Sequence, residues 1–203
     1  TSLKELLNHS EPLTHVAGDV NSTAVLEDYA FLAETSLTAY QITGDLSYLK
    51  SSIRLTDEAI DRFEMKDSPL FSNSAKKATN GVPRIINSSD GVLPNPNASL
   101  LTTIYHLSHI TGKESYKKRY EAMLTNIQPW VSESIGFFPS WASNLLYSQH
   151  PFYEVVVMGV EAKPYAKKLL KEQYANTLIL YSKEDTKESP LFKNRFVKDE
   201  TLI

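Results

Sequence analysis

A stretch of nine residues occurs twice in this chain and decides its architecture. The first copy is ITGDLSYLK, residues Ile42–Lys50, and the second is ITGKESYKK, residues Ile110–Lys118. Six of the nine positions are identical, and the copies start 68 residues apart. In each copy a glycine, the residue that most readily ends a helix in the left-handed conformation, follows a stretch of helical periodicity. A second periodic stretch begins a few residues later. Two helices joined this tightly must run antiparallel, so the sequence predicts a series of αα-hairpins.

Apolar residues around the two glycines have the spacing of amphipathic helices. They predict four long helices, at about 26–43, 48–63, 97–111 and 116–130. Residues 67–96 are rich in proline and glycine and predict a long connection, with short strands at 70–72 and 83–86. Shifting the chain by 68 residues lays Leu26–Thr35 over Pro94–Thr103. We therefore expect the starts of these two helices to be equivalent and to point to the same side.

The character of the chain changes after about residue 133. A short helix is expected at 139–147, followed by two β-branched, strand-like runs at Glu154–Gly159 and Asn176–Tyr181. The amphipathic stretch Lys163–Gln173 separates them, so we expect a small βαβ unit with parallel strands. The sequence thus predicts a mainly α region at 1–150 and a small α/β appendage at 151–203.

Composition excludes several classes of function. The net charge of −3 argues against a nucleic-acid partner, which requires a basic face for phosphates. No run of about 18 apolar residues is present, so no membrane span is expected. With no cysteine, the segment has neither disulfides nor thiolate chemistry. The first residues show no signal peptide, and a cytoplasmic location is the default expectation.

Two aspartates are the candidate catalytic acids. Asp28 lies in LEDYAF, residues Leu26–Phe31, at the start of a helix, and Asp90 lies in a Ser-Asp-Gly turn before the equivalent helix. Two carboxylates facing one cavity suit acid–base chemistry on a sugar. The alternative is that Asp28 complements the helix dipole and Asp90 shapes its turn.

Four further residues are candidates for substrate binding, each with a structural alternative. Tyr29 and Trp141 would stack on a sugar ring, or belong to the core. Asn97 would contact a ligand, or cap its helix. Arg84 would pair with an acid in the cavity, or lie exposed in its loop.

No metal site or cofactor is predicted. His106 and His109 stand three residues apart on one helix, a spacing that suits a metal pair. No third ligand is near them in sequence, and the rest of that helix face is apolar.

Four motifs in order resemble a known family. They are LEDYAF at 26–31, SDGVLPNPNA at 89–98, FYEVVVMG at 152–159 and PLFK at 190–193. Together they resemble the C-terminal part of the thioredoxin-domain-containing proteins related to spermatogenesis-associated protein 20, over about residues 20–203. The resemblance implies part of an (α/α)6 toroid, similar to N-acylglucosamine 2-epimerases and six-hairpin glycosidases. It also implies that the thioredoxin-like domain and the remaining toroid hairpins lie outside this chain.

The chain departs from the family in the second motif. The usual Pro-Ser-Gly-Asn-Ser is here Pro94-Asn95-Pro96-Asn97-Ala98. Both serine hydroxyls are gone, and Pro96 fixes its φ and removes a backbone donor.

Two hypotheses of function follow. In the first, the chain belongs to a carbohydrate-related toroid, a hydrolase or epimerase that uses Asp28 and Asp90 in a central cavity. In the second, it is a non-catalytic αα-hairpin scaffold that partners a thioredoxin-like domain. A partial ring exposes apolar hairpin faces, so we expect this fragment alone to self-associate.

Overall fold

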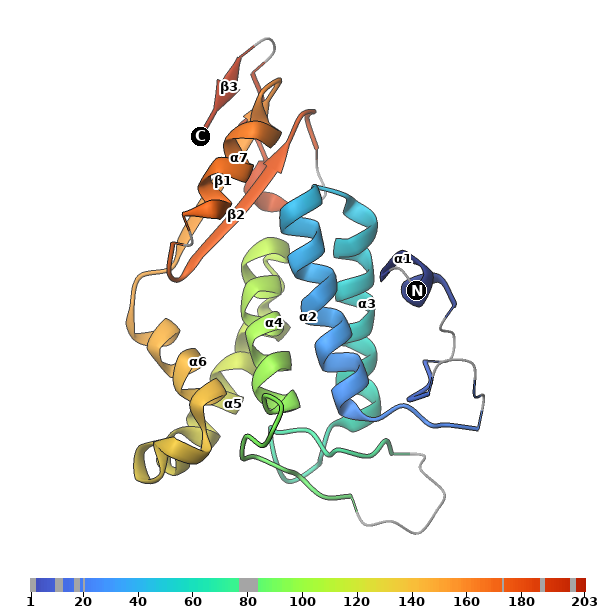
Figure 1. The fold of residues 1–203 in the computed structure, drawn as a ribbon. Coiled ribbons are helices and arrows are strands. Elements are labelled where there is room, and N and C mark those ends of the chain that lie inside the picture. The colour runs from blue at the N-terminus through green and yellow to red at the C-terminus, as the bar shows by residue number, and fades with distance from the viewer. Residues whose placement is uncertain are drawn as a thin grey trace.

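The computed structural model describes residues 3–9, 13–16, 19, 21–76, 84–172, 174–186, 189–197 and 200–203. A bundle of helices carries a small sheet at one end (Figure 1). The helices of the bundle are α1 (Leu3–His9), α2 (Leu26–Thr43), α3 (Leu46–Phe63), α4 (Pro96–Thr111), α5 (Glu114–Glu133) and α6 (Pro139–Gln149), with a short 3-10 turn, η1 (Ile135–Phe137), before α6. The C-terminal elements are β1 (Tyr153–Gly159), α7 (Ala162–Lys171), β2 (Thr177–Ser182), η2 (Pro190–Phe192) and β3 (Thr201–Leu202). The protein is therefore mainly helical with a small three-stranded sheet, as the sequence predicted.

The repeated stretch forms the same turn twice. Gly44 and Gly112 adopt left-handed φ values of 70° and 67°. Each donates its N–H to the carbonyl four residues earlier, at 2.8 and 2.9 Å. The hydroxyls of Thr43 and Thr111 each accept the N–H two residues further on, at 3.2 Å in both copies. The two turns share these conformations and bonds, so the internal repeat is confirmed, although only the first has a side-chain cap, from Asp45.

The paired helices pack as two antiparallel hairpins. α2 lies against α3 and α4, and α4 also lies against α5 and α6. α4 buries residues around much of its circumference, whereas the fully buried residues of α2, α3 and α5 lie on one face of each helix. Both α2 and α4 begin at the end of the bundle away from the sheet (Figure 1). The expected equivalence of these two helix starts is therefore confirmed.

The C-terminal sheet has the order β2-β1-β3. β1 pairs with β2 in parallel, from Tyr153 opposite Thr177 to Met158 opposite Ser182. β3 pairs with the end of β1 in the antiparallel sense. The predicted parallel βαβ unit is thus confirmed, and the strand-like ending of the chain adds the third strand.

The two faces of the sheet are covered differently. Val156 and Met158 belong to the same hydrophobic core as the helices. Val157 packs instead with Ala162 and Ala166 of α7. Because one core crosses from the bundle into the sheet, the division into two domains near residue 150 stays a prediction.

The C-terminal unit binds both glycine turns. The hydroxyl of Tyr181 donates to the carbonyl of Ile42 at 3.0 Å. The hydroxyl of Ser189, buried, donates to the carbonyl of Ile110, the same position in the second copy. Helix-terminal carbonyls have no partner within their own helix. The C-terminal unit therefore supplies one hydroxyl to each repeated turn.

The connection between α3 and α4 differs from expectation. Phe71 makes only an isolated bridge with Glu64, and residues 84–86 form no strand. Residue 83 lies outside the described residues. The prediction of strands there was wrong because these segments bond to helix ends and side chains rather than to a sheet. Within the described ranges, the helices are all too short or too polar to cross a membrane.

Candidate functional site

Asp28 stands in the first turn of α2. Val25, the residue before the helix, has no side-chain acceptor, and Asp28 Oδ2 accepts the Val25 N–H at 2.8 Å. Both carboxylate oxygens also lie 3.0 Å from Nδ1 of His15. The Asp28 side chain is 20% exposed and the His15 side chain 53%. Asp28 thus stabilises the helix start while keeping one face toward solvent.

Asp90 fastens three segments together. Its Oδ1 accepts the N–H of Asn95 at 2.6 Å, and its Oδ2 accepts the N–H of Ser140 at 3.0 Å. Its own N–H donates to the carbonyl of Phe137 at 2.8 Å. The carboxylate therefore ties the loop before α4 to η1 and α6. Asp28 and Asp90 have separate sets of hydrogen-bond partners.

Asn97 is fully buried and pairs with the backbone of Phe71. Its Oδ1 accepts the Phe71 N–H at 2.7 Å, and its Nδ2 donates to the Phe71 carbonyl at 3.0 Å. Asn95, not Asn97, caps α4 through its side-chain oxygen. The capping alternative for Asn97 was therefore two residues out of place. Pro96 occupies the first helical position, where its missing N–H costs no hydrogen bond.

Arg84 closes the end of α3. Its Nη2 donates to the carbonyls of Phe63 and Glu64, both at 2.9 Å. These are orphan carbonyls of a helix C-terminus, where a cation is also favoured by the dipole. Arg84 is thus neither paired with a candidate acid nor free in its loop.

Two of the candidate aromatic residues belong to the core. Tyr29 is fully buried, with its ring 5.5 Å from that of Phe63 in an edge-on arrangement. Trp141 is also fully buried, and its indole N–H donates to the carbonyl of Ser88 at 2.7 Å. Neither ring presents a face to a ligand in this conformation.

The six candidate residues fall into separate groups. Asp90 and Trp141 both hold the loop at 88–90 to the start of α6. Tyr29 and Arg84 both contact Phe63. The equivalent helix starts are on one side, as predicted, but most of these side chains are engaged by the protein itself.

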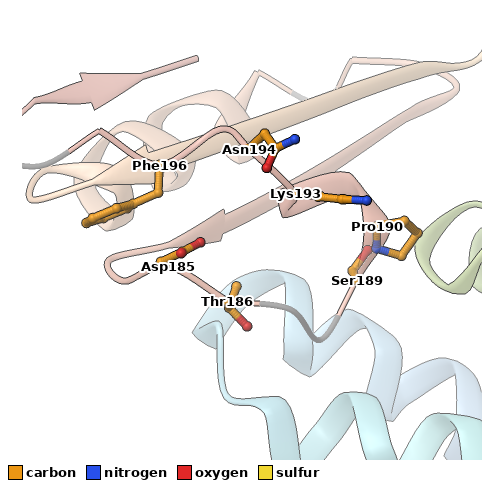
Figure 2. A pocket seen from close by; sticks show the side chains of 7 residues that line it. All are labelled: Asp185, Thr186, Ser189, Pro190, Lys193, Asn194 and Phe196. Carbon is orange, nitrogen blue, oxygen red and sulfur yellow. The ribbon is translucent and has the colours of Figure 1, made fainter.

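A large cavity lies at the other end of the molecule, beside the sheet (Figure 2). It has a volume of about 590 Å³ and is lined by Asp185, Thr186, Ser189, Pro190, Lys193, Asn194 and Phe196. Ser189 uses its hydroxyl to bind Ile110, and the two charged residues are exposed. This cavity is therefore an open groove at the joint between the sheet and the helices.

The histidine pair of α4 does not form a metal site. Burial, and to a lesser degree His109, lowers the pKa of His106 to about 4, so its ring is neutral at neutral pH. His109 Nδ1 instead lies 2.8 Å from Glu154 Oε1 on β1. Among the described residues no group of three or more metal-ligating side chains occurs. Sequence reasoning missed the pairing with Glu154 because 45 residues separate the two partners.

Comparison with known proteins gives a distant relationship. No family model matches the chain. Spermatogenesis-associated protein 20 of Rattus norvegicus is 24% identical over 147 residues, and that of Mus musculus is 23% identical over 147 residues. Each match covers 72% of this chain and 19% of the relative. The chain spans about a fifth of the length of the curated relatives it matches. By sequence the chain is distantly similar to spermatogenesis-associated protein 20.

Proposed function

We propose that this chain is a non-catalytic αα-hairpin scaffold within a longer protein. The observation that carries the proposal is the bonding of Asp90. Both of its carboxylate oxygens accept backbone N–H groups, from Asn95 and from Ser140. A general acid or a nucleophile needs at least one carboxylate oxygen directed at substrate. The oxygens of Asp90 are directed at the fold.

The other candidate residues support the same conclusion. Asn97, Arg84 and Trp141 all bond to backbone groups, at distances of 2.7 to 2.9 Å for their shortest bonds. Removing such a side chain leaves a backbone group without a partner, which costs about 1–3 kcal/mol. The expected consequence of losing any of them is lower stability rather than a lost reaction.

The repeat supports a place for this scaffold in a ring of hairpins. Two hairpins with identical turns stand side by side, with α2 and α4 starting at the same end. Further hairpins of the same kind would extend this arrangement into an (α/α) toroid. A thioredoxin-like domain is the partner we propose for it, on the family resemblance.

The experiment measures the melting temperatures of the wild type and its variants with and without saccharides. Asp90→Ala should lower the melting temperature. It leaves two N–H groups without a partner, which should reduce the free energy of unfolding by about 2 kcal/mol. Asp67→Asn, an exposed loop aspartate, serves as the control and should melt like the wild type. A panel of mono- and disaccharides should shift none of the melts. A sugar that stabilises the wild type but not Asp90→Asn would contradict the scaffold proposal.

A second candidate function, sugar binding at a hydrolase- or epimerase-type site, rests on Asp28. Its carboxylate is partly exposed and pairs with the more exposed His15 at 3.0 Å. A carboxylate and an imidazole are the side chains that general acid–base catalysis uses most often. Loss of saccharide binding in Asp28→Ala, seen by saturation-transfer NMR, would support this candidate. Absence of any saccharide signal from the wild type would eliminate it.

A further inference from the structure

A second cavity lies between the last turn of α4 and the first turns of α5. Its volume is about 360 Å³, within the usual range for small-molecule sites of about 300–1,000 Å³. Tyr105, His109 and Tyr120 line one side, and Gly112 leaves another part of the wall without a side chain. None of these residues belongs to the candidate site near Asp28 and Asp90.

Aromatic rings form the fixed wall of this cavity. The rings of Tyr105 and Tyr120 are stacked, with centroids 4.6 Å apart and planes 25° apart. The hydroxyl of Tyr120 donates to the carbonyl of Asn144, which holds that ring in place. Burial raises the pKa of both phenols, so neither carries a charge at neutral pH. Because the two rings are stacked on each other, the wall offers mainly their uncharged edges to a ligand.

His109 is the polar group that this wall positions. Its Nδ1 lies 2.8 Å from Glu154 Oε1, and its ring centroid lies 5.0 Å from that of Tyr105 and 4.1 Å from that of Phe152. The side chain remains 29% exposed. A carboxylate on one ring nitrogen fixes the ring orientation and leaves the other nitrogen, Nε2, for a further hydrogen bond. Within the described ranges no contact to Nε2 is formed.

The charges at the rim attract neither an anion nor a cation strongly. Lys117 contributes a positive charge, and Glu114 and Glu121 contribute negative ones. Lys113 is turned toward α3, where its Nζ lies 3.3 Å from Asp57 Oδ2. With both signs represented, the rim has no strong preference for an anion or a cation.

We propose that this cavity binds a small, neutral, planar ring that carries a hydrogen-bonding group on its edge. The ring lies against the Tyr105–Tyr120 wall, and its edge group bonds to Nε2 of His109. Glu154 is a positioning residue, because it acts on the ligand through the imidazole. This binding site goes beyond the proposed scaffold function. A small molecule bound there would regulate the scaffold or be recognised by it.

The test uses ligand-observed NMR with the whole 203-residue chain. The probes are 2-pyridone and phenol, with cyclohexanol as a non-planar alcohol and benzoate as a charged ring. We expect the two neutral rings to bind and cyclohexanol and benzoate to bind at least tenfold more weakly. His109→Gln should weaken 2-pyridone binding about tenfold, the loss of roughly one good hydrogen bond.

Matched variants separate binding from stability. His150→Gln removes an exposed histidine outside the cavity and should bind 2-pyridone like the wild type. Glu154→Gln keeps an oxygen that can accept a hydrogen bond from His109. Its affinity for 2-pyridone should therefore lie between those of the wild type and His109→Gln. The ring protons of His109 in the wild type should also shift when 2-pyridone is added, which tests the site even if a variant fails to fold.

Two results would overturn the proposal. The first is the absence of binding by either neutral ring. The second is unchanged binding by His109→Gln with a native melt. A lower melting temperature in His109→Gln, with no ligand bound by the wild type, would make the His109–Glu154 contact a structural tie between α4 and β1 only.

Discussion

The hydroxyl of Tyr181 donates to the carbonyl of Ile42 across 139 residues of sequence, at 3.0 Å. Its ring carbon Cε2 would also lie 2.9 Å from a Cβ placed on Gly44. A single side chain on β2 thus bonds to the end of α2 and packs against the bare glycine that terminates it. The contact joins the sheet to the first hairpin.

Tyr181→Phe should lower the free energy of unfolding by about 1 kcal/mol, because it removes one hydrogen bond and keeps the ring. Urea denaturation measures the change. Tyr174→Phe alters an exposed tyrosine and should leave the denaturation midpoint where it was. Equal midpoints for wild type and Tyr181→Phe would mean that the bond adds nothing to stability.

Replacing either repeated glycine with alanine should lower the free energy of unfolding, by different amounts at the two positions. Both positions have positive φ, so alanine is strained at either by roughly 1 kcal/mol. At Gly44 the new methyl group would also meet the Tyr181 ring at 2.9 Å, whereas at Gly112 the nearest atom, Pro190 Cγ, lies 3.6 Å away. Gly44→Ala should therefore be the more destabilising variant by urea denaturation, and the reverse order would contradict the contact at the first turn.

Asn97→Ala should destabilise the protein by about 2–4 kcal/mol. It leaves both the N–H and the carbonyl of Phe71 buried without a partner. Chemical denaturation of Asn97→Ala alongside Asn126→Ala checks this, since Asn126 is exposed on α5 and alanine there favours the helix. Similar midpoints for the two variants would show that Phe71 finds other partners.

Asp45 should make stability depend on pH in the acid range. The Ser47 hydroxyl, followed by Lys4, lowers the pKa of Asp45 to about 2. Because the folded pKa lies below the unfolded value of about 3.9, the stabilisation is complete above about pH 5 and is lost as pH falls toward 2. The stability difference between wild type and Asp45→Asn should therefore shrink between pH 5 and pH 2. A difference that stays constant over this range would rule out the charge of Asp45 as its cause.

Self-association should depend on the apolar side chains around η1. Phe137 is 67% exposed and Ile135 64%. Exposed apolar groups of this kind promote association. Light scattering should show species larger than 22.9 kDa for the wild type, and Phe137→Ser with Ile135→Ser should reduce them. A clean monomer at high concentration would argue that the hairpins need no further partner.

Much of the fold could be predicted from the sequence because its signals are local. Gly44 and Gly112 end their helices within the repeated stretch, and β-branched runs mark β1 and β2. The capping of α4 was shifted by two residues, because Asn95 and Asn97 are both reasonable caps and only packing shows that Asn97 is needed by Phe71.

The roles of the candidate site residues were harder to predict. Asp90 is defined by bonds to Asn95 and to Ser140, 50 residues away. Arg84 takes its role from its bonds to the carbonyls at the end of α3. His109 takes its role from its contact with Glu154 on β1. Residue type shows that such side chains must find partners, but only the three-dimensional path of the chain decides which partners they find.

The hydroxyls that meet the two glycine turns also constrain the order of folding. The carbonyls of Ile42 and Ile110 are synthesised long before Tyr181 and Ser189, which lie 139 and 79 residues further along the chain. Contacts between such distant positions form late, since a long loop must close first. Both hairpins therefore emerge from the ribosome with these carbonyls still hydrated. The segment that locks the two hairpins in register therefore follows both of them in the chain.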